Sequence, residues 1–260
     1  MRESIGSEGV DGSVNVVCTD RSAASIAVAH YLVDEIKCLA ERAKREPLSK
    51  QRIVIALCGG TSPKAVFPKL IDLLSELSPT TLARLAFVLI DERRAPLDSP
   101  DSNFRLLSAE LFSPLVGRGL LELAQIFPFG VELSPEIACQ RYTETIQSLG
   151  GIDIGLLGVG PDSHVAALFP GHPLLEVSEA KYCFLDDRPK PPAEGFTASP
   201  GLISAIPLLI GFFFGEEKRA ALLGYLDHQP RTLCPAALLR SSARRLVVTD
   251  ICDTGRDLAV

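Results

Sequence analysis

The sequence predicts an α/β fold with three layers, α/β/α. Short apolar, β-branched segments alternate along the chain with longer segments of helical periodicity. The segment RIVIALC (52–58) is apolar on both faces, as a strand in a covered parallel sheet must be. No change in composition or linker divides the chain. We therefore expect a mostly parallel, Rossmann-like sheet with helices on both faces, a flexible tail at 1–12, and one domain over 13–260.

The strands are predicted from apolar runs that end at glycine, proline or charged residues. In chain order these runs are 14–18, 52–58, 83–90, 125–129, 151–160, 181–187, 206–215 and 244–250. Several end in polar clusters, which is where open α/β sheets bind their ligands.

The helices are predicted from apolar residues recurring at helical spacing. They cover 20–46, 64–77, 104–112, 134–149, 165–169, 216–226 and 235–242. In the first, Ile26, Ala29, Val33, Ile36 and Ala40 form one face, and basic residues gather at the far end. In the second, Pro68 falls past the first turn and is expected to kink the helix.

Composition excludes several classes of protein. The 26 basic and 32 acidic residues give a net charge of −6 without a basic patch, so we expect no nucleic-acid partner. Seven scattered cysteines without paired spacing predict neither a disulfide framework nor a metal site, and suggest a reducing cytoplasm. The longest apolar run, AIPLLIGFFFG, is far shorter than the roughly 20 residues of a membrane helix. We expect a cytoplasmic monomer or weak homo-oligomer with no membrane contact.

Three polar clusters follow predicted strands and would meet at one sheet edge. The first, Gly59-Gly60-Thr61-Ser62-Pro63, offers backbone N–H groups and two hydroxyls to a phosphate, or is an ordinary turn in which Ser62 caps a helix. The second, Asp91-Glu92-Arg93-Arg94, offers Arg93 or Arg94 to a phosphate and Asp91 to a histidine or substrate hydroxyl. Its alternative is a solvated ion-pair cluster.

The third cluster, Gly160-Pro161-Asp162-Ser163-His164, carries the sharpest signal. We expect His164 on a turn from strand to helix, where it would act as a general base. Asp162 would fix its tautomer or raise its basicity. The alternative is a histidine that caps a helix. Of the other histidines, we expect His172 at the surface.

Several common motifs are missing from the sequence. There is no G-x-S-x-G nucleophile motif, no Walker loop and no complete G-x-G-x-x-G. The sequence therefore gives no support to a serine nucleophile, NAD or ATP.

An ordered series of segments resembles a known family. CGGTSPKAVFPKL, LIDERRAPLDSPDSNFRLL, GLLGVGPDSHVAALFPGHP, RPKPPAEGFT and PAALLR together resemble the 6-phosphogluconolactonases of the pentose phosphate pathway. That family belongs to the superfamily of glucosamine-6-phosphate isomerases and deaminases. The resemblance runs from about residue 14 to about 250.

The resemblance implies hydrolysis of 6-phospho-D-glucono-1,5-lactone, with no metal and no organic cofactor. His164 would be the base that activates water. The Gly59–Pro63 turn, Arg93 and Lys190 would hold the phosphate and nearby oxygens, and Asp91 and Asn103 would shape the pocket.

The sequence departs from the family pattern at three positions. Ser163 replaces a glycine, Val165 replaces a threonine, and Gly195 follows Glu194 where the family carries an arginine. Two alternatives therefore accompany the lactonase: a sugar-phosphate isomerase or deaminase of the same superfamily, for which Asp91 is the candidate acid, and a sugar-phosphate-binding protein without activity.

Overall fold

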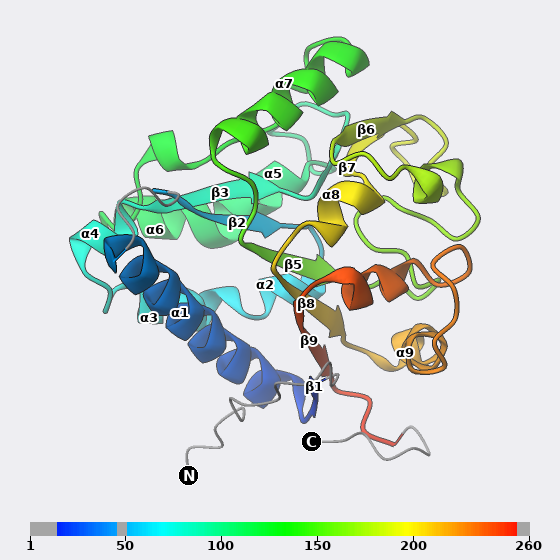
Figure 1. Cartoon of the computed structure of the whole chain (residues 1–260), viewed down its shortest axis with the longest axis horizontal. Coiled ribbons are helices and arrows are strands. Elements are labelled where there is room, and N and C mark those ends of the chain that lie inside the picture. Colours follow the sequence, from blue (N-terminus) through cyan, green and yellow to red (C-terminus); the bar gives the residue numbers. More distant parts are fainter. Residues whose placement is uncertain (1–14, 46–50, 254–260) are drawn as a thin grey trace.

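The main sheet is parallel throughout. The computed structural model describes residues 15–45 and 51–253, and within them a six-stranded sheet has the order β1-β9-β8-β5-β2-β3. Every neighbouring pair of these strands is parallel. The strands are β1 (Asn15–Cys18), β2 (Ile53–Leu57), β3 (Leu85–Leu89), β5 (Ile154–Gly158), β8 (Leu208–Phe213) and β9 (Arg244–Thr249). Helices lie on both sides of it, as predicted (Figure 1).

A smaller antiparallel sheet adjoins the carboxyl end of β3. Its order is β4 (Asp91–Arg93), β7 (Gly195–Ala198) and β6 (Tyr182–Leu185). The Ala198 N–H donates to the carbonyl of Ile90, 2.8 Å away, which joins the two sheets where β3 leads into β4. The sequence predicted β6 but neither β4 nor β7.

The helices are unequal in length, and the longest is α1. They are α1 (Arg21–Arg45), α2 (Thr61–Lys64), α3 (Phe67–Leu74), α4 (Pro79–Leu82), α5 (Asn103–Leu107), α6 (Ser113–Gly117), α7 (Pro135–Ser148), α8 (Pro200–Ser204) and α9 (Arg219–Leu226). A π-helical turn, Ser108–Phe112, joins α5 to α6. Short 3-10 turns cover Leu123–Gln125, Pro173–Glu176, Glu216–Lys218 and Pro235–Ser241.

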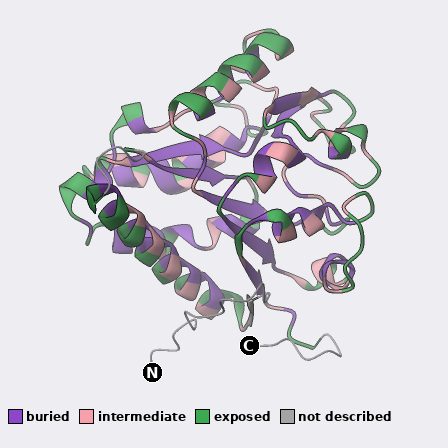
Figure 2. Cartoon of the chain, viewed as in Figure 1, coloured by how far each residue is buried: buried purple, intermediate pink, exposed green. Residues whose placement is uncertain are grey.

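Two apolar cores lie on opposite faces of the main sheet. Alternate residues of β2 divide between them: Ile53, Ile55 and Leu57 pack with α1 and α3, whereas Val54 and Ala56 pack with α7 and α8. All residues of β2, β3 and β8 are buried, as the apolar composition of these strands requires. Figure 2 shows the buried strands between helices whose outer faces are exposed.

Four local predictions were wrong. Ile26 is 44% exposed, although the other four residues predicted for that face of α1 are buried. Pro68 lies in the first turn of α3, where its missing N–H costs nothing, so it starts a helix rather than kinking one. Residues 125–129 form only an isolated bridge from Ile126 to Phe87.

The fourth concerns 165–169, which are not helical. Val165 forms bridges with Val159 and with Leu168, so the segment after β5 is a compact loop. Ser163 and Ala166 have φ values of 67° and 54°, which interrupt any helix. His164 therefore lies in a loop that folds back on the end of β5.

The remaining expectations concern cysteines and domains. Cys38, Cys58, Cys139, Cys183 and Cys234 carry free thiols, whereas Cys252 is disulfide-bonded, which the cysteine spacing did not predict. The predicted tail at 1–12 lies outside the described residues, and the single domain over 13–260 stays a prediction. Among the described helices, none has the length and apolar character needed to cross a membrane.

Candidate active site

The turns after β2, β3 and β5 lie side by side because these strands are neighbours in the parallel sheet. The Gly158 N–H donates to Cys58 Sγ at 3.0 Å, which ties the end of β5 to the end of β2. A Cβ at Gly158 would lie 3.4 Å from Pro63 Cδ, in ordinary van der Waals contact. The predicted convergence of the Gly59–Pro63 turn with the 158–164 segment is therefore present.

Asn103 joins the first two clusters. Its side-chain nitrogen donates to the Asp91 carbonyl at 2.9 Å and to the Asp91 carboxylate at 3.0 Å. A Cβ at Gly59 would lie 1.9 Å from Asn103 Oδ1, so only glycine lets the turn and the amide approach each other this closely. Asp91 is 5% exposed and Asn103 is 1% exposed. Asp91 and Asn103 thus form a buried polar pair that packs against Gly59.

Glu92, which the sequence reasoning left without a role, organises the start of α5. Its carboxylate accepts from the Ser102 hydroxyl at 3.0 Å and from the N–H groups of Asn103 and Phe104, each at 2.8 Å. Burial raises the pKa of Glu92 despite these donors. Its position one residue before Arg93 on a short strand means that it also fixes where that arginine lies.

His164 and Asp162 form a pair on the loop after β5. The imidazole Nδ1 lies 2.5 Å from Asp162 Oδ1, and this hydrogen bond lowers the pKa of Asp162 to about 2. A Cβ at Gly160 would lie 2.0 Å from His164 Nδ1, so this glycine makes room for the imidazole. Phe169 packs at 4.9 Å from the imidazole centroid. Within the described chain, Nε2 of His164 has no hydrogen-bond partner.

His172 makes an instructive contrast. Its Nε2 contacts Asp187 at 2.9 Å and its Nδ1 accepts from the Leu174 N–H at 3.1 Å, so both ring nitrogens are engaged. Its side chain is 14% exposed, so it reaches the surface only in part. A ring without a free nitrogen has none to offer a water molecule. Of these two histidines, His164 is the one that keeps a ring nitrogen without a partner among the described residues.

Two of the three departures from the family pattern lie in the loop that carries His164. Ser163 adopts the left-handed conformation that favours glycine, and its hydroxyl donates to the Leu233 carbonyl at 3.4 Å. Val165 is fully buried in the core. The side chains of both residues thus contact the protein interior.

The two adjacent arginines of the second cluster have different surroundings. Arg94 makes an ion pair with Glu194 at 2.8 Å. Arg93 donates from one terminal nitrogen to the Asp101 carbonyl at 2.6 Å, and its Nε is buried without a partner. Of the two, Arg93 is therefore the arginine that makes no ion pair among the described residues, which separates them where the sequence left the choice open.

Further cations lie nearby. Lys190 is exposed on the loop between β6 and β7, and its charge contributes to lowering the pKa of Lys218, an effect that comes mainly from burial of Lys218. Asp162 acts on Lys218 in the opposite direction, so this lysine also lies near the His164 pair. Lys218 follows β8, the neighbour of β5, and the sequence reasoning missed it. Strand order gives the only signal that could have identified it.

Not all predicted residues come together. Asp162 is the only carboxylate in contact with His164 among the described residues, so Asp91 does not orient the imidazole. In the Gly59–Pro63 turn, Gly60 is the N-cap of α2 with φ 102°, and no side chain caps this helix. The alternative in which Ser62 is the cap is therefore wrong, since Ser62 lies inside α2.

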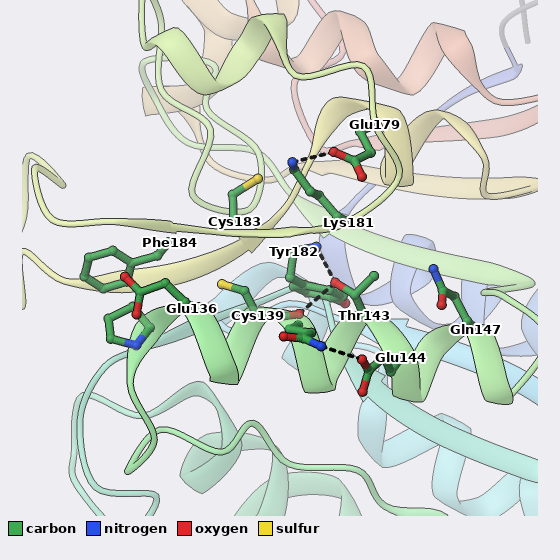
Figure 3. Close-up of a pocket in the computed structure, with 12 residues that line it drawn as sticks. Glu136, Cys139, Thr143, Glu144, Gln147, Glu179, Lys181, Tyr182, Cys183 and Phe184 are labelled. Atoms are coloured by element: carbon green, nitrogen blue, oxygen red, sulfur yellow. Dashed lines mark hydrogen bonds and ion pairs between the residues drawn. The ribbon is translucent and has the colours of Figure 1, made fainter.

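Two cavities lie away from these turns. One, of about 510 Å³, is a groove between α7 and β6 lined by Cys139, Thr143, Lys181 and Cys183, among others (Figure 3). Its polar side chains largely bond one another or the neighbouring backbone, as Lys181 does with Glu179 at 2.5 Å. The other lies beside α5 and α6. In the described residues no group of His, Cys, Asp and Glu is suited to hold a metal ion.

The turns of this parallel α/β sheet carry a histidine–carboxylate pair, a buried amide and, among the described residues, cations without ion pairs, an arrangement typical of α/β enzymes that act on small anionic molecules. Residues 20–248 match the model of the family described as glucosamine-6-phosphate isomerases/6-phosphogluconolactonase. The chain belongs to this family. It is 30% identical over 204 residues to the 6-phosphogluconolactonase of Homo sapiens, a match that covers 76% of this chain and 78% of that protein.

Solved structures agree on the fold. The 6-phosphogluconolactonase of Thermotoga maritima superposes with a TM-score of 0.71 at 25% identity, covering 91% of this chain and 98% of that one. A monomeric glucosamine-6-phosphate deaminase superposes with a TM-score of 0.74 at 22% identity, covering 92% and 98%. Since both activities occur on this fold, the choice between them depends on the site.

Proposed function

We propose that this chain hydrolyses 6-phospho-D-glucono-1,5-lactone to 6-phosphogluconate, with His164 as the general base. The observation that carries the proposal is the His164–Asp162 pair, which has Nδ1 engaged at 2.5 Å and Nε2 unpartnered. The curated relatives named 6-phosphogluconolactonase support the choice of substrate.

The proposed reaction needs no covalent nucleophile, because a lactone is an activated ester. Asp162 accepts a hydrogen bond from Nδ1–H of His164, which leaves the Nε2 lone pair free to take a water proton. The water oxygen attacks the lactone carbonyl carbon as Nε2 takes that proton. The ring oxygen then leaves and receives a proton from the imidazolium. The low pKa of Asp162, about 2, keeps the carboxylate charged at neutral pH.

The proposal places the phosphate at the cations. Arg93 has a buried Nε without a partner, and Lys190 is exposed on the loop before β7, where its charge acts on Lys218. The N–H groups of the Gly59–Pro63 turn and the Thr61 hydroxyl are further donors, and Asn103 would orient the sugar hydroxyls. Binding energy gained at the phosphate would hold the carbonyl carbon against the water.

The isomerase or deaminase alternative gains less support from Asp91. Its carboxylate is 5% exposed and accepts from Asn103 at 3.0 Å, an arrangement that suits a positioning group. Purified chain supplied with glucosamine 6-phosphate tests the alternative. Conversion of that substrate without lactone hydrolysis would replace the proposal.

The direct test follows acid release from the lactone in a pH-stat, against the spontaneous rate. We expect His164→Ala to lower kcat by about 10²- to 10⁴-fold, the usual contribution of a general base. Affinity for 6-phosphogluconate should remain within about threefold. His30→Ala, an exposed residue of α1, is the matched control. Wild-type turnover equal to the spontaneous rate would favour the binding-protein alternative, and an unchanged rate in His164→Ala would remove the base assignment.

A further inference from the structure

Arg188 lies on the loop between β6 and β7, where its side chain bonds a backbone carbonyl and not a carboxylate. One terminal nitrogen of its guanidinium donates to the Pro192 carbonyl at 2.8 Å, and its backbone N–H donates to the Ala193 carbonyl at 3.1 Å. These bonds hold the side chain against the turn. Its Nε is buried without a partner. No carboxylate within the described chain makes an ion pair with Arg188.

The side chain of Arg188 lies over Gly195. A Cβ at position 195 would lie 3.0 Å from Arg188 Cδ, 3.5 Å from Arg188 Nε and 3.0 Å from the Glu92 carbonyl oxygen. A larger residue there would press on both the arginine and the backbone of β4. The observed position of the Arg188 side chain therefore requires a glycine at position 195.

Arg188 shares its surroundings with Arg93. Gly195 is paired with Arg93 across the β4–β7 ladder. Burial lowers the pKa of Arg188, and the positive charge of Arg93 lowers it further. The charges of Asp91, Glu92 and Asp101 act in the opposite direction, although none of these carboxylates is in contact with Arg188. Glu92 is already occupied by its bonds to the start of α5.

Two neighbouring guanidinium groups therefore each carry a buried, unsatisfied Nε. Burying a charged group without a partner costs free energy, and placing two like charges together adds to that cost. A doubly charged oxyanion between them would remove both costs, because it accepts several hydrogen bonds and neutralises both cations.

We infer that Arg188, presented over Gly195, binds the phosphate of the substrate together with Arg93. The inference rests on the proposed function for the identity of the substrate, and it gives this chain a counterpart to the arginine that the family pattern carries at position 195. Arg188, which lies in the loop before β7, would supply the positive charge that is absent because position 195 is a glycine. Arg94 takes no part, because Glu194 neutralises it.

The test measures binding separately from turnover. Titration calorimetry measures the affinity for 6-phosphogluconate and for gluconate. Arg188→Ala should lower the affinity for 6-phosphogluconate by about 10- to 100-fold, the usual range for a lost charge-assisted contact. Gluconate binding should be unchanged. Arg188→Lys should be intermediate, since lysine keeps the charge but loses the fork. Arg94→Ala is the matched control and should bind as the wild type does.

A positional exchange separates phosphate binding from loop stabilisation. Gly195→Arg alone should crowd Arg188 and weaken binding, whereas Arg188→Ala combined with Gly195→Arg should recover part of the lost affinity. Recovery in the double variant, which lacks the bond to Pro192, supports a ligand role. Wild-type affinity in Arg188→Ala, or equal losses for both ligands, would overturn it. Failure of the wild type to hydrolyse the lactone would remove only the proposed reaction, because these titrations need no turnover.

Discussion

At the scale of single residues, the contact between His164 and Asp162 has consequences for both rate and stability. The side chain of Asp162 is 46% exposed, and yet the bond to the imidazole holds its pKa at about 2. The carboxylate is therefore available as an acceptor at every pH at which the protein would work. Removing the Asp162 charge should therefore change both the rate of hydrolysis and the pH dependence of stability.

We expect Asp162→Asn to lower kcat for the lactone by about tenfold, which corresponds to one lost charge-assisted hydrogen bond of roughly 1.4 kcal/mol. KM should change little, because Asp162 does not lie among the arginines. Initial rates over a range of substrate concentrations check this. A rise in KM at constant kcat would contradict it.

The same substitution has a signature in the pH dependence of stability. A carboxyl group whose pKa is lowered on folding stabilises the protein above its unfolded pKa, and that contribution is lost as the pH falls through the folded pKa. For Asp162 the window runs from about pH 4 down to about pH 2. Urea unfolding should therefore show wild type more stable than Asp162→Asn at pH 6, with a gap of about 1 kcal/mol or less after solvent screening. The gap should close across this window, and a constant gap would exclude the linkage.

Ser163 supplies a second prediction at this scale. A side chain at φ 67° carries roughly 1 kcal/mol of strain that glycine does not. Ser163→Gly should therefore raise the unfolding midpoint by about 2–4 °C, as thermal denaturation would show. Ser163→Ala keeps the strain and serves as the control. A gain in Ser163→Ala as large as that in Ser163→Gly would mean that the hydroxyl, and not the backbone, sets the cost.

At the scale of elements, the close approach of α5 to the turn after β2 depends on Gly59. A methyl group there would collide with the Asn103 amide, which Asp91 holds in place. Gly59→Ala should cost about 1–3 kcal/mol of unfolding free energy, the usual price of overpacking, and should also lower kcat/KM. Gly117→Ala in α6 meets nothing within 4 Å and is the control. Chemical denaturation measures the unfolding free energy of both variants. An equal loss of unfolding free energy in Gly59→Ala and Gly117→Ala would contradict the steric argument.

The sequence was informative wherever a pattern is local. The apolar runs at 52–58, 83–90 and 206–215 each became a buried parallel strand, since composition and length define such strands. The short strand β7 was missed, because GFTA follows a proline-rich loop and pairs only with β4 and β6. Residues 165–169 have helical composition, but the Ala167 N–H bonds the Thr197 hydroxyl at 3.2 Å. Such long-range partners are invisible to periodicity.

The candidate site was predictable to a similar extent. Strand ends placed the Gly59–Pro63 turn, Asp91 and His164 at one edge, because parallel neighbours share that edge. Lys218 was missed, because nothing in its local sequence marks it, and only its proximity to Asp162 does. Its location required the strand order.

At the scale of the whole molecule, a chain with a net charge of −6 concentrates cations at one edge. Arg93, Arg188, Lys190 and Lys218 have no ion pairs among the described residues, so a local positive field would attract a phosphorylated substrate. KM for the phosphorylated lactone should rise as salt increases from about 20 to 300 mM, because the Debye length shortens over that range. KM for glucono-1,5-lactone should not change. Equal salt dependence of both substrates, measured by initial rates, would rule out steering by charge.

The union of the two sheets at Ile90 and Ala198 has a consequence for substrate size. The imidazole is attached to the six-stranded sheet through β5, whereas Arg93 is attached to the three-stranded sheet through β4. The distance between the imidazole and the Arg93 guanidinium is thus set by how one sheet packs on the other, and this distance determines the length of sugar phosphate that can reach both groups. A small rigid-body shift at this junction would change the preferred length of the phosphosugar without replacing any side chain.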